Sequence, residues 1–367
     1  CTVRNCRIES GGRVHPAAVG VFIGHSASNV VEHNEIADFF YTGISVGWTW
    51  NTNANPAHHN RIAMNHIHHL GQGVLSDMGG IYTLGRQPGT VLVGNRIHDV
   101  SRDRYGGWGI YLDEGSSQIR VESNLVYRTQ DAPFHAHACR ENELVANVFA
   151  LGTNAAMQFS NKPRLGPFSI RHNVWLALNA RLVERAREPK DDVTFENNLY
   201  WCAAGAIEFP GGLDYPKWRA REPTATVAHP GFRDPSAEDY SFAPDATAAA
   251  RIGPEPPWKR AGVLDRRPRP GVPAVPRPFA PAAVAPAPIL SLREGFERWT
   301  VGQPWQGMTA SFGSRQHSAI VTEDTAAPGG RRSLEFRDGP SGRGYEPHLY
   351  LLLEHYTSGV VRAGMDM

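Results

Sequence analysis

A six-residue pattern of apolar and polar positions recurs along the first half of the chain. It consists of an apolar residue, two variable residues, asparagine, one variable residue and a second apolar residue, as in residues 31–36 (VEHNEI). The marker positions lie 28, 31, 30, 29, 23, 26 and 25 residues apart and are occupied by Cys6, Asn34, Asn65, Asn95, Asn124, Asn147, Asn173 and Asn198. A repeat of this length with short β-rich segments is typical of a solenoid.

The repeat predicts a right-handed parallel β-helix. Each coil contributes short strands that pair with the coils above and below it at about 4.8 Å, and alternate side chains point inward. An asparagine in a tight corner can adopt the left-handed conformation, and successive asparagines can form a hydrogen-bonded ladder. The apolar residues on either side of each marker then fill the core. A leucine-rich repeat fits less well, because Val, Ile and aromatic residues occupy these positions without leucine spacing.

The composition changes after Asn198 and divides the rest of the chain. Residues 254–288 contain 11 prolines, which favours an extended linker. Residues 294–297, 318–322 and 333–336 alternate apolar and polar residues, as half-buried strands do. We therefore expect an all-β chain with three parts: a parallel β-helix over 1–252, a Pro-rich linker over 253–288 and a partial β-sandwich over 289–367. Because the chain opens inside a repeat and the last domain stops early, we expect both ends to be truncated.

Charge and composition exclude several classes of protein. The chain has 37 basic and 36 acidic residues, which gives no bulk electrostatic reason to bind nucleic acid or an anionic membrane. No apolar run reaches the roughly 18–20 residues that a membrane span needs. The four cysteines form no C-x-x-C motif, so we expect free or buried thiols at Cys1, Cys6, Cys139 and Cys202.

A further strand in several coils predicts the functional face. We aligned these strands on the inward residues Ile44, Ile81, Ile110, Phe134 and Met157. Because successive side chains of a strand point to opposite faces, two rows of residues then point outward. The first row is Ser45, Tyr82, Tyr111, His135 and Gln158, and the second is Gly47, Leu84, Asp113, His137 and Ser160. Tyrosine, histidine, aspartate and glutamine in adjacent coils are typical of a sugar cleft, because sugar rings stack on aromatic side chains and sugar hydroxyls need paired donors and acceptors.

Two aspartates are the candidate catalytic pair. Asp77 comes from a glycine-containing loop and Asp113 from the next coil, so both are expected at related heights. A glycosidase needs one protonated carboxyl and one carboxylate, about 5–5.5 Å apart for retention or roughly 6.5–9.5 Å apart for inversion. Glu114 is an alternative to Asp113. If these residues have structural roles only, Asp77 caps a turn, and Asp113 or Glu114 is a solvated charge at the end of a strand.

Other residues on this face have supporting roles in the prediction. His135 and His137 are expected to tune or orient the carboxylates. Trp48, Tyr82, Trp108 and Tyr111 are expected to line the sugar subsites, and an acidic sugar could meet Arg86 or Arg140.

Histidine is concentrated in this region, since eight of the 16 histidines lie between His58 and His137. A metal site would need such residues. However, His68 and His98 share one repeat position, so repetition explains them without a metal. We therefore predict no metal and no cofactor.

Three runs resemble the β-helix carbohydrate-active proteins of glycoside hydrolase family 141: residues 76–85 (SDMGGIYTLG), 106–117 (GGWGIYLDEGSS) and 134–142 (FHAHACREN). The likeness covers residues 1–250. It implies hydrolysis of plant cell-wall glycans, as an α-L-fucosidase on pectic side chains or as a xylanase. It also implies a pair of catalytic aspartates, which we match to Asp77 and Asp113. The partner would be an oligosaccharide or polysaccharide substrate, and we expect a monomer from a secreted or periplasmic parent protein.

Two alternatives remain open from the sequence. A polysaccharide lyase on the same scaffold abstracts a proton next to a carboxylate, often with a lysine or arginine base. The first lysine of the chain is Lys162, and a guanidinium is very hard to deprotonate. A non-catalytic glycan-binding or adhesive β-helix would keep the aromatic residues and would need no carboxylate pair.

Overall fold

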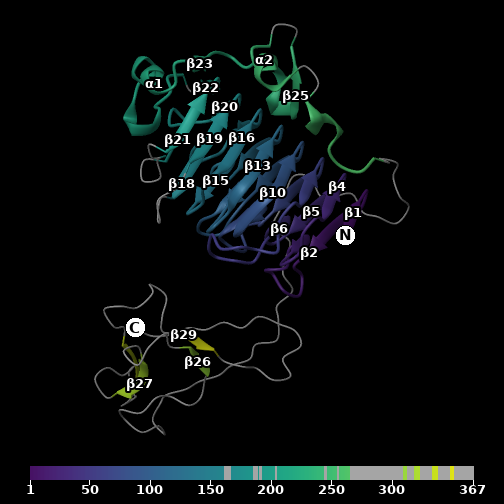
Figure 1. Cartoon of the computed structure of the whole chain (residues 1–367), viewed down its shortest axis with the longest axis vertical. Coiled ribbons are helices and arrows are strands. Elements are labelled where there is room, and N and C mark those ends of the chain that lie inside the picture. The colour runs from purple at the N-terminus through teal and green to yellow at the C-terminus, as the bar shows by residue number, and fades with distance from the viewer. Residues whose placement is uncertain are drawn as a thin grey trace. The chain divides into compact units, whose positions relative to one another are not determined.

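The computed structural model describes residues 1–160, 167–184, 189, 192–202, 205–243, 246–253 and 256–264, together with four short strands further on. Two compact units are present, Cys1–Ala282 and Ala283–Met367, and each is described by itself. The first unit winds into a β-solenoid made of three parallel sheets, with the N-terminus at one end and α1 at the other (Figure 1). Among the described residues, no helix is both long enough and apolar enough to cross a membrane.

The three sheets follow the coils in order, and each has its own place in the repeat. The first sheet, before the markers, contains β1 (Thr2–Arg4), β4 (Val30–Glu32), β7 (Arg61–Ala63), β10 (Arg86–Val93), β13 (Ser117–Glu122), β16 (Asn142–Val145), β19 (Phe168–Arg171) and β21 (Val193–Glu196). The second sheet, after the markers, contains β2 (Arg7–Gly11), β5 (Glu35–Phe39), β8 (His66–Leu70), β11 (Arg96–Val100), β14 (Leu125–Thr129), β17 (Val148–Ala150), β20 (Val174–Ala177), β22 (Leu199–Cys202) and β23 (Thr226–Val227). The third sheet contains β3 (Val21–Ile23), β6 (Ile44–Val46), β9 (Met78–Thr83), β12 (Gly107–Leu112), β15 (Phe134–His137) and β18 (Met157–Ser160).

The predicted core rows are confirmed. In the first sheet the residue three before each marker stacks on its equivalent, as Ile62 does between Val31 and Leu92. In the second sheet the residue two after each marker does the same, and Ile97 pairs with both Ile67 and Val126. All of these side chains are buried. The parallel β-helix is therefore held by continuous apolar rows along the inside of each sheet.

A ladder of buried asparagines joins the first sheet to the second. Asn95 shows the pattern: its Oδ1 accepts hydrogen bonds from both the backbone N and the Nδ2 of Asn65, each at 3.0 Å. Its own Nδ2 donates to Ile62 O and to Asn124 Oδ1, both at 2.9 Å. Corresponding side-chain contacts run from Asn34 to Asn198. The ladder satisfies polar groups that the coil corners bury and fixes the register of each coil on the next.

The left-handed corner residue differs from the prediction. It is the residue before each marker, not the asparagine, that has a positive φ. These residues are Asn5, His33, Met64, Gly94, Ser123, Ala146, His172 and Asn197, with φ between 53° and 67°. None is β-branched, which fits the steric cost of this conformation for branched side chains. The asparagine can therefore keep its side chain in the ladder while its neighbour makes the turn.

The ladder ends on a carboxylate at α1 (Tyr215–Arg221). Glu222 Oε1 accepts from the backbone N and Nδ2 of Asn198, both at 2.9 Å. Its Oε2 accepts from Tyr200 Oη at 2.6 Å and Trp218 Nε1 at 3.0 Å. Glu222 is fully buried, and this burial raises its pKa. The short helix thus closes this end of the hydrogen-bonded array.

The segment after α1 packs along the second sheet. Besides η1 (Pro210–Gly212) before α1, its elements are β24 (Phe232–Asp234), η2 (Pro235–Ala237), β25 (Asp239–Phe242), α2 (Ala249–Ile252) and η3 (Pro257–Arg260). Trp258 is buried in an apolar cluster with Leu125 and Tyr127, and Gly262 N donates to Met64 O at 2.8 Å. The start of the predicted linker is therefore packed on the β-helix, whereas 265–288 lies outside the described residues. The division of the chain at residue 252 stays a prediction.

The second unit contains four described strands in two antiparallel pairs. β26 (Thr309–Ser311) pairs with β29 (His348–Tyr350), and β27 (Ser318–Thr322) pairs with β28 (Ser333–Arg337). The strands expected at 318–322 and 333–336 are thus confirmed, while the strand expected at 294–297 lies outside the described residues. The described part of the chain is mainly β-structure, in line with the predicted all-β class.

We expect Asn95→Ala to lower the free energy of unfolding by on the order of 3 kcal/mol, because it leaves several buried groups unpaired at about 1–3 kcal/mol each. Urea unfolding followed by circular dichroism measures the change. Asn53→Ala, at an exposed loop asparagine, is the control and should stay within about 0.5 kcal/mol of the wild type. A loss below about 1 kcal/mol for Asn95→Ala would contradict the structural role of the ladder.

Candidate active site

The outward row of the third sheet is continuous, as predicted. Ser45 pairs with Tyr82, Tyr82 with Tyr111, Tyr111 with His135, and His135 with Gln158. The side chains nevertheless cover one another, and Tyr82, Tyr111 and His135 are all less than 9 % exposed. The row therefore forms a packed aromatic floor from which the polar ends of the side chains emerge.

Asp77 lies in a tight turn directly before β9. Its φ is 62°, a left-handed value that aspartate tolerates better than most residues. Its backbone N donates to Tyr105 O at 3.0 Å, and its backbone O accepts from Tyr41 Oη at 2.8 Å. A Cβ at Gly106 would lie 2.7 Å from Asp77 Cα and N, so only glycine allows this close approach. Neighbouring backbone and the Tyr41 hydroxyl therefore fix the turn that presents Asp77.

The carboxyl of Asp77 does not cap its own turn. Within the described part of the chain, no backbone amide donates a hydrogen bond to it. Tyr111 Oη instead contacts Asp77 Oδ1 at 3.4 Å. This geometry removes the turn-capping role that sequence reasoning left open for Asp77.

Asp113 follows β12 in the next coil and lies beside the same tyrosines. Its Oδ2 accepts a hydrogen bond from Tyr82 Oη at 2.5 Å, and its charge acts on the Tyr111 hydroxyl that contacts Asp77. Asp113 is only 6 % exposed, so it is not a solvated charge at the end of a strand, which was the non-catalytic alternative for this residue. The two carboxyls thus face one group of tyrosine hydroxyls from neighbouring coils.

The environment raises the pKa of Asp77. Burial raises the pKa of Asp77, and the charge of Asp113 raises it further, whereas Tyr111 and His137 lower it. Burial and the two aspartates also raise the pKa of the hydroxyls of Tyr41, Tyr82 and Tyr111, so these groups remain hydrogen-bond donors at neutral pH. The environment of Asp77 thus favours the protonated form of this carboxyl over its ionised form.

The two histidines of the predicted site differ in their surroundings. His135 is 1 % exposed, stacks on Trp108 with ring centroids 4.1 Å apart, and lies 3.4 Å from Gln158 Oε1 through its Nδ1. His137 is partly exposed and acts electrostatically on Asp77. His137 therefore interacts with Asp77, whereas His135 packs among the aromatic side chains of the floor; a tuning role for either histidine stays a prediction.

Of the aromatic residues that the sequence placed in the cleft, Trp48 and Trp50 are exposed, whereas Tyr82, Trp108 and Tyr111 are buried. Trp108 is 2 % exposed, donates from Nε1 to Gln158 Oε1 and packs against Tyr111 and His135, so it is part of the floor. Phe22, Trp48 and Trp50 are each about half exposed. Their rings form a chain of edge contacts, 5.4 Å from Phe22 to Trp48 and 4.7 Å from Trp48 to Trp50. We call these three residues the aromatic platform; it adjoins the floor because Phe22 pairs with Ser45.

Sequence reasoning missed the contributions of Tyr41, Tyr105 and Phe22. Tyr105 belongs to the glycine-containing loop before β12, and its hydroxyl interacts with Asp77. Phe22 occupies the same repeat position as Ser45 one coil earlier, so extending the alignment by one coil would have found it. Tyr41 carries no periodic signal, because it follows the end of β5.

Three predicted residues are not brought to the aspartate pair. Arg86 begins β10 of the first sheet and donates from Nε to Gln118 Oε1 at 3.0 Å. Arg140 is exposed beside the first sheet, 3.5 Å from Glu141 Oε1. Glu114 contributes its backbone carbonyl, which accepts from Gly85 N at 3.1 Å. Asp113 is thus the carboxyl that contacts Tyr82, the catalytic choice between Asp113 and Glu114 stays a prediction, and both arginines adjoin the first sheet.

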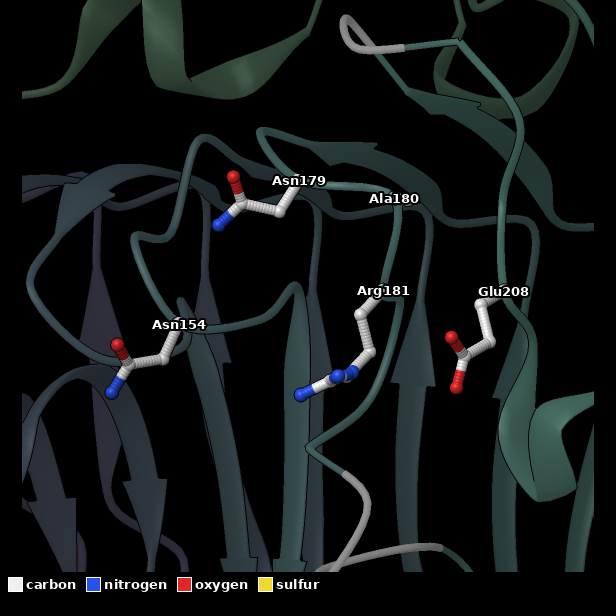
Figure 2. A pocket seen from close by; sticks show the side chains of 5 residues that line it. All are labelled: Asn154, Asn179, Ala180, Arg181 and Glu208. Atoms are coloured by element: carbon white, nitrogen blue, oxygen red, sulfur yellow. The ribbon is translucent and has the colours of Figure 1, made fainter.

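Two cavities in the described residues lie apart from the pair, because neither Asp77 nor Asp113 lines them. One of about 390 Å³ is lined by Ala54, Asn55, Pro56, His58, Arg86 and Pro88. The other, of about 310 Å³, is lined by Asn154, Asn179, Ala180, Arg181 and Glu208. Figure 2 shows the Arg181 side chain between those of Asn154 and Glu208.

Comparison with known proteins gives one match. No protein-family model and no curated protein matches the chain. A solved structure described as a glycoside hydrolase is 28 % identical over the matched part, with a TM-score of 0.33. The match covers 40 % of this chain and 23 % of that protein.

We expect Asp77→Asn to raise the melting temperature by a few degrees at pH 7. The pKa of Asp77 is higher in the folded chain than in the unfolded chain, so ionisation removes stability as the pH rises through that pKa. The asparagine variant escapes this loss. The difference should shrink as the pH falls toward the ordinary aspartate pKa of about 3.9. Calorimetry across this range measures it.

The exposed loop residue Asp103 provides the control for this measurement. Asp103→Asn should leave the melting temperature almost unchanged at every pH. An Asp77→Asn variant that is no more stable than the wild type at pH 7 would contradict the buried, charge-coupled environment assigned to Asp77.

Proposed function

We propose that this chain is a glycoside hydrolase in which Asp77 is the general acid and Asp113 is the base or nucleophile. The observation that carries the proposal is the meeting of both carboxyls at the hydroxyls of Tyr82 and Tyr111. The raised pKa of Asp77 supports its role as the acid. A pair of carboxyls in unlike environments is the usual apparatus for hydrolysis of a glycosidic bond.

In the proposed reaction, Asp77 protonates the oxygen of the leaving sugar. Asp113 attacks the anomeric carbon or activates a water molecule that does so. The hydrogen bond from Tyr82 orients Asp113. His137 acts on Asp77 through its charge and lowers the pKa of that carboxyl.

The aromatic platform supports a sugar as substrate. Phe22, Trp48 and Trp50 present half-exposed rings, and Phe22 continues the outward row that contains Ser45 and Tyr82; sugar rings pack their apolar faces on such surfaces. Because the side-chain contacts that the structure gives Arg86 and Arg140 are with Gln118 and Glu141 rather than with either aspartate, we propose a neutral sugar at the cleaved bond. A fucosylated pectic side chain or a xylan chain, the substrates implied by the resemblance, meets this requirement.

The remaining expectations about the parent protein belong to the same proposal. We place it outside the cytoplasm, secreted or periplasmic, because plant cell-wall polysaccharides are too large to enter a cell intact. We also propose that it acts as a monomer.

We expect Asp77→Asn and Asp113→Asn each to reduce turnover by about 10²–10⁴-fold, the usual contribution of an acid or base, while glycan binding persists. Product analysis with fucosylated pectic and xylan oligosaccharides measures turnover, and calorimetric titration measures binding. Glu114→Gln tests the neighbouring carboxylate and should retain most activity. Asp103→Asn is the neutral control.

Each alternative predicts a different result in this experiment. A lyase would release unsaturated products that absorb ultraviolet light. An adhesive β-helix would bind glycan without turnover, and neither aspartate variant would change that binding. Full turnover by Asp77→Asn would contradict the proposed acid.

We expect Trp48→Ala to raise KM by about tenfold, because loss of a stacking contact worth about 1 kcal/mol or slightly more weakens substrate binding. The melting temperature should change little, since Trp48 is 49 % exposed. Leu178→Ala removes another exposed apolar side chain, 41 % exposed and outside the third sheet, and should leave KM unchanged. Steady-state kinetics on the best oligosaccharide checks this, and an unchanged KM for Trp48→Ala would remove the platform from the binding site.

A further inference from the structure

A cluster of histidines and acids lies on the outward side of the second sheet, away from the aspartate pair. β8 contributes His66 and His68 to the outward rows, and His69 follows in a left-handed corner. In the adjacent coils Glu35 pairs with His66, and His98 pairs with His68. Shared repeat position therefore explains why His68 and His98 stack, as the sequence suggested, but it does not explain the other members of the cluster.

Glu35, His66 and His68 bring three ligand atoms together. One donor atom from each residue lies within 4.8 Å of the other two. Glu35 Oε1 is 3.5 Å from His68 Nε2, while Glu35 Oε2 faces Arg7 at 3.0 Å. A tetrahedral zinc ion with bonds of 2.0–2.1 Å holds its ligands about 3.3 Å apart. The spacing of Glu35 and His68 is thus close to that of two ligands of one metal ion.

Two buried polar atoms near these residues are poorly satisfied among the described residues. Glu9 Oε2 has no hydrogen-bond partner there, and the contact of His68 Nε2 with Glu35 Oε1, at 3.5 Å, is longer than an ordinary hydrogen bond. Glu9 occupies the same outward row, because it pairs with Ala37 and Ala37 pairs with His68. Buried polar atoms are almost always satisfied, so two such atoms in one row indicate a missing partner.

The neighbouring residues hold the rings in place. His68 Nδ1 lies 2.6 Å from His69 Nδ1, which leaves His68 Nε2 directed to Glu35. His66 Nε2 lies 2.8 Å from His98 Nε2, and His98 Nδ1 lies 2.6 Å from Asp99 Oδ2. Chains of this kind, from a carboxylate through imidazole to a ligand, are common around metal-binding histidines.

A second group of three, His69, His98 and Asp99, is a poorer candidate. Both oxygens of Asp99 already accept from Arg128, Oδ1 from Nε at 2.8 Å and Oδ2 from Nη2 at 2.6 Å. A guanidinium therefore occupies the place that a metal ion would need. Glu35, in contrast, uses one oxygen for Arg7 and directs the other to His68.

We propose that Glu35, His66 and His68 bind a divalent transition-metal ion of the zinc type. Two imidazoles and one carboxylate suit zinc, whereas calcium and magnesium prefer oxygen ligands alone. Glu9 or a water molecule completes the coordination. The ion joins β5 to β8 beneath the returning C-terminal segment, where a Cβ at Gly262 would lie only 3.2 Å from His66 Cβ. Its role is to stabilise the fold, and it is independent of the glycosidase proposal.

The test uses the full chain without a histidine tag. The protein is dialysed against ZnCl2 and then against metal-free buffer, and its metal content is measured by mass spectrometry. We expect one zinc ion per chain and a melting temperature that rises with zinc concentration. CaCl2 should produce neither effect. A wild-type chain that retains no zinc would overturn the proposal.

The zinc affinities of single-residue variants test where the ion binds. Glu35→Gln and His68→Gln should each weaken zinc binding at least tenfold in a competition titration with a chelating dye. His59→Gln removes one member of an exposed histidine pair, His58 and His59, and should bind like the wild type. Circular dichroism checks folding; if His68→Gln does not fold, the more exposed Glu35→Gln decides. Equal binding by Glu35→Gln and the wild type, or loss of binding only in His59→Gln, would place the ion elsewhere.

Discussion

The hydrogen bonds between buried asparagine side chains are the constraint on which this fold depends. Each marker asparagine from Asn65 to Asn198 accepts two hydrogen bonds from the preceding coil, and each donates onward, as Asn95 does to Asn124. These contacts fix how each coil sits on its neighbour. In a strand with a two-residue period, a slip of one position would exchange inward and outward side chains. The ladder therefore keeps the apolar rows inside, and it also keeps Tyr82, Tyr111 and His135 aligned outside.

Alignment of equivalent positions concentrates similar chemistry on each face. On the third sheet it places tyrosine hydroxyls beside two aspartates, one from a strand end and one from a constrained turn. On the second sheet it stacks His68 on His98 with rings inclined by only 4°. A repeating scaffold can therefore form a site with few residue differences between one coil and the next. The loops between the strands supply the side chains that the strands cannot place there. Asp77 is such a loop residue, held by Tyr41 and by close packing on Gly106.

The rows of stacked side chains could be predicted from the sequence, because they follow from the two-residue alternation of a strand and from the spacing of the markers. The inward series from Ile44 to Met157 and the outward series from Ser45 to Gln158 are both present. Burial of the outward row was not predictable in the same way. Trp108 is covered because loops and neighbouring rings pack over it, and these contacts have no sequence period. The contact of His66 with His98 was also beyond the pattern, because it joins different repeat positions.

The carboxylate at the end of the ladder gives the whole array a direction. The side-chain amide of each asparagine donates a hydrogen bond toward the later coil, and Glu222 accepts the last of these bonds through a carboxylate oxygen. A carboxylate has no N–H group to pass onward. The hydrogen-bonded array therefore has a polarity along its length, and it ends at Glu222, the residue that follows α1. The second sheet continues for one more strand, because β23 pairs with β22, so the side-chain ladder ends before the strand pairing does.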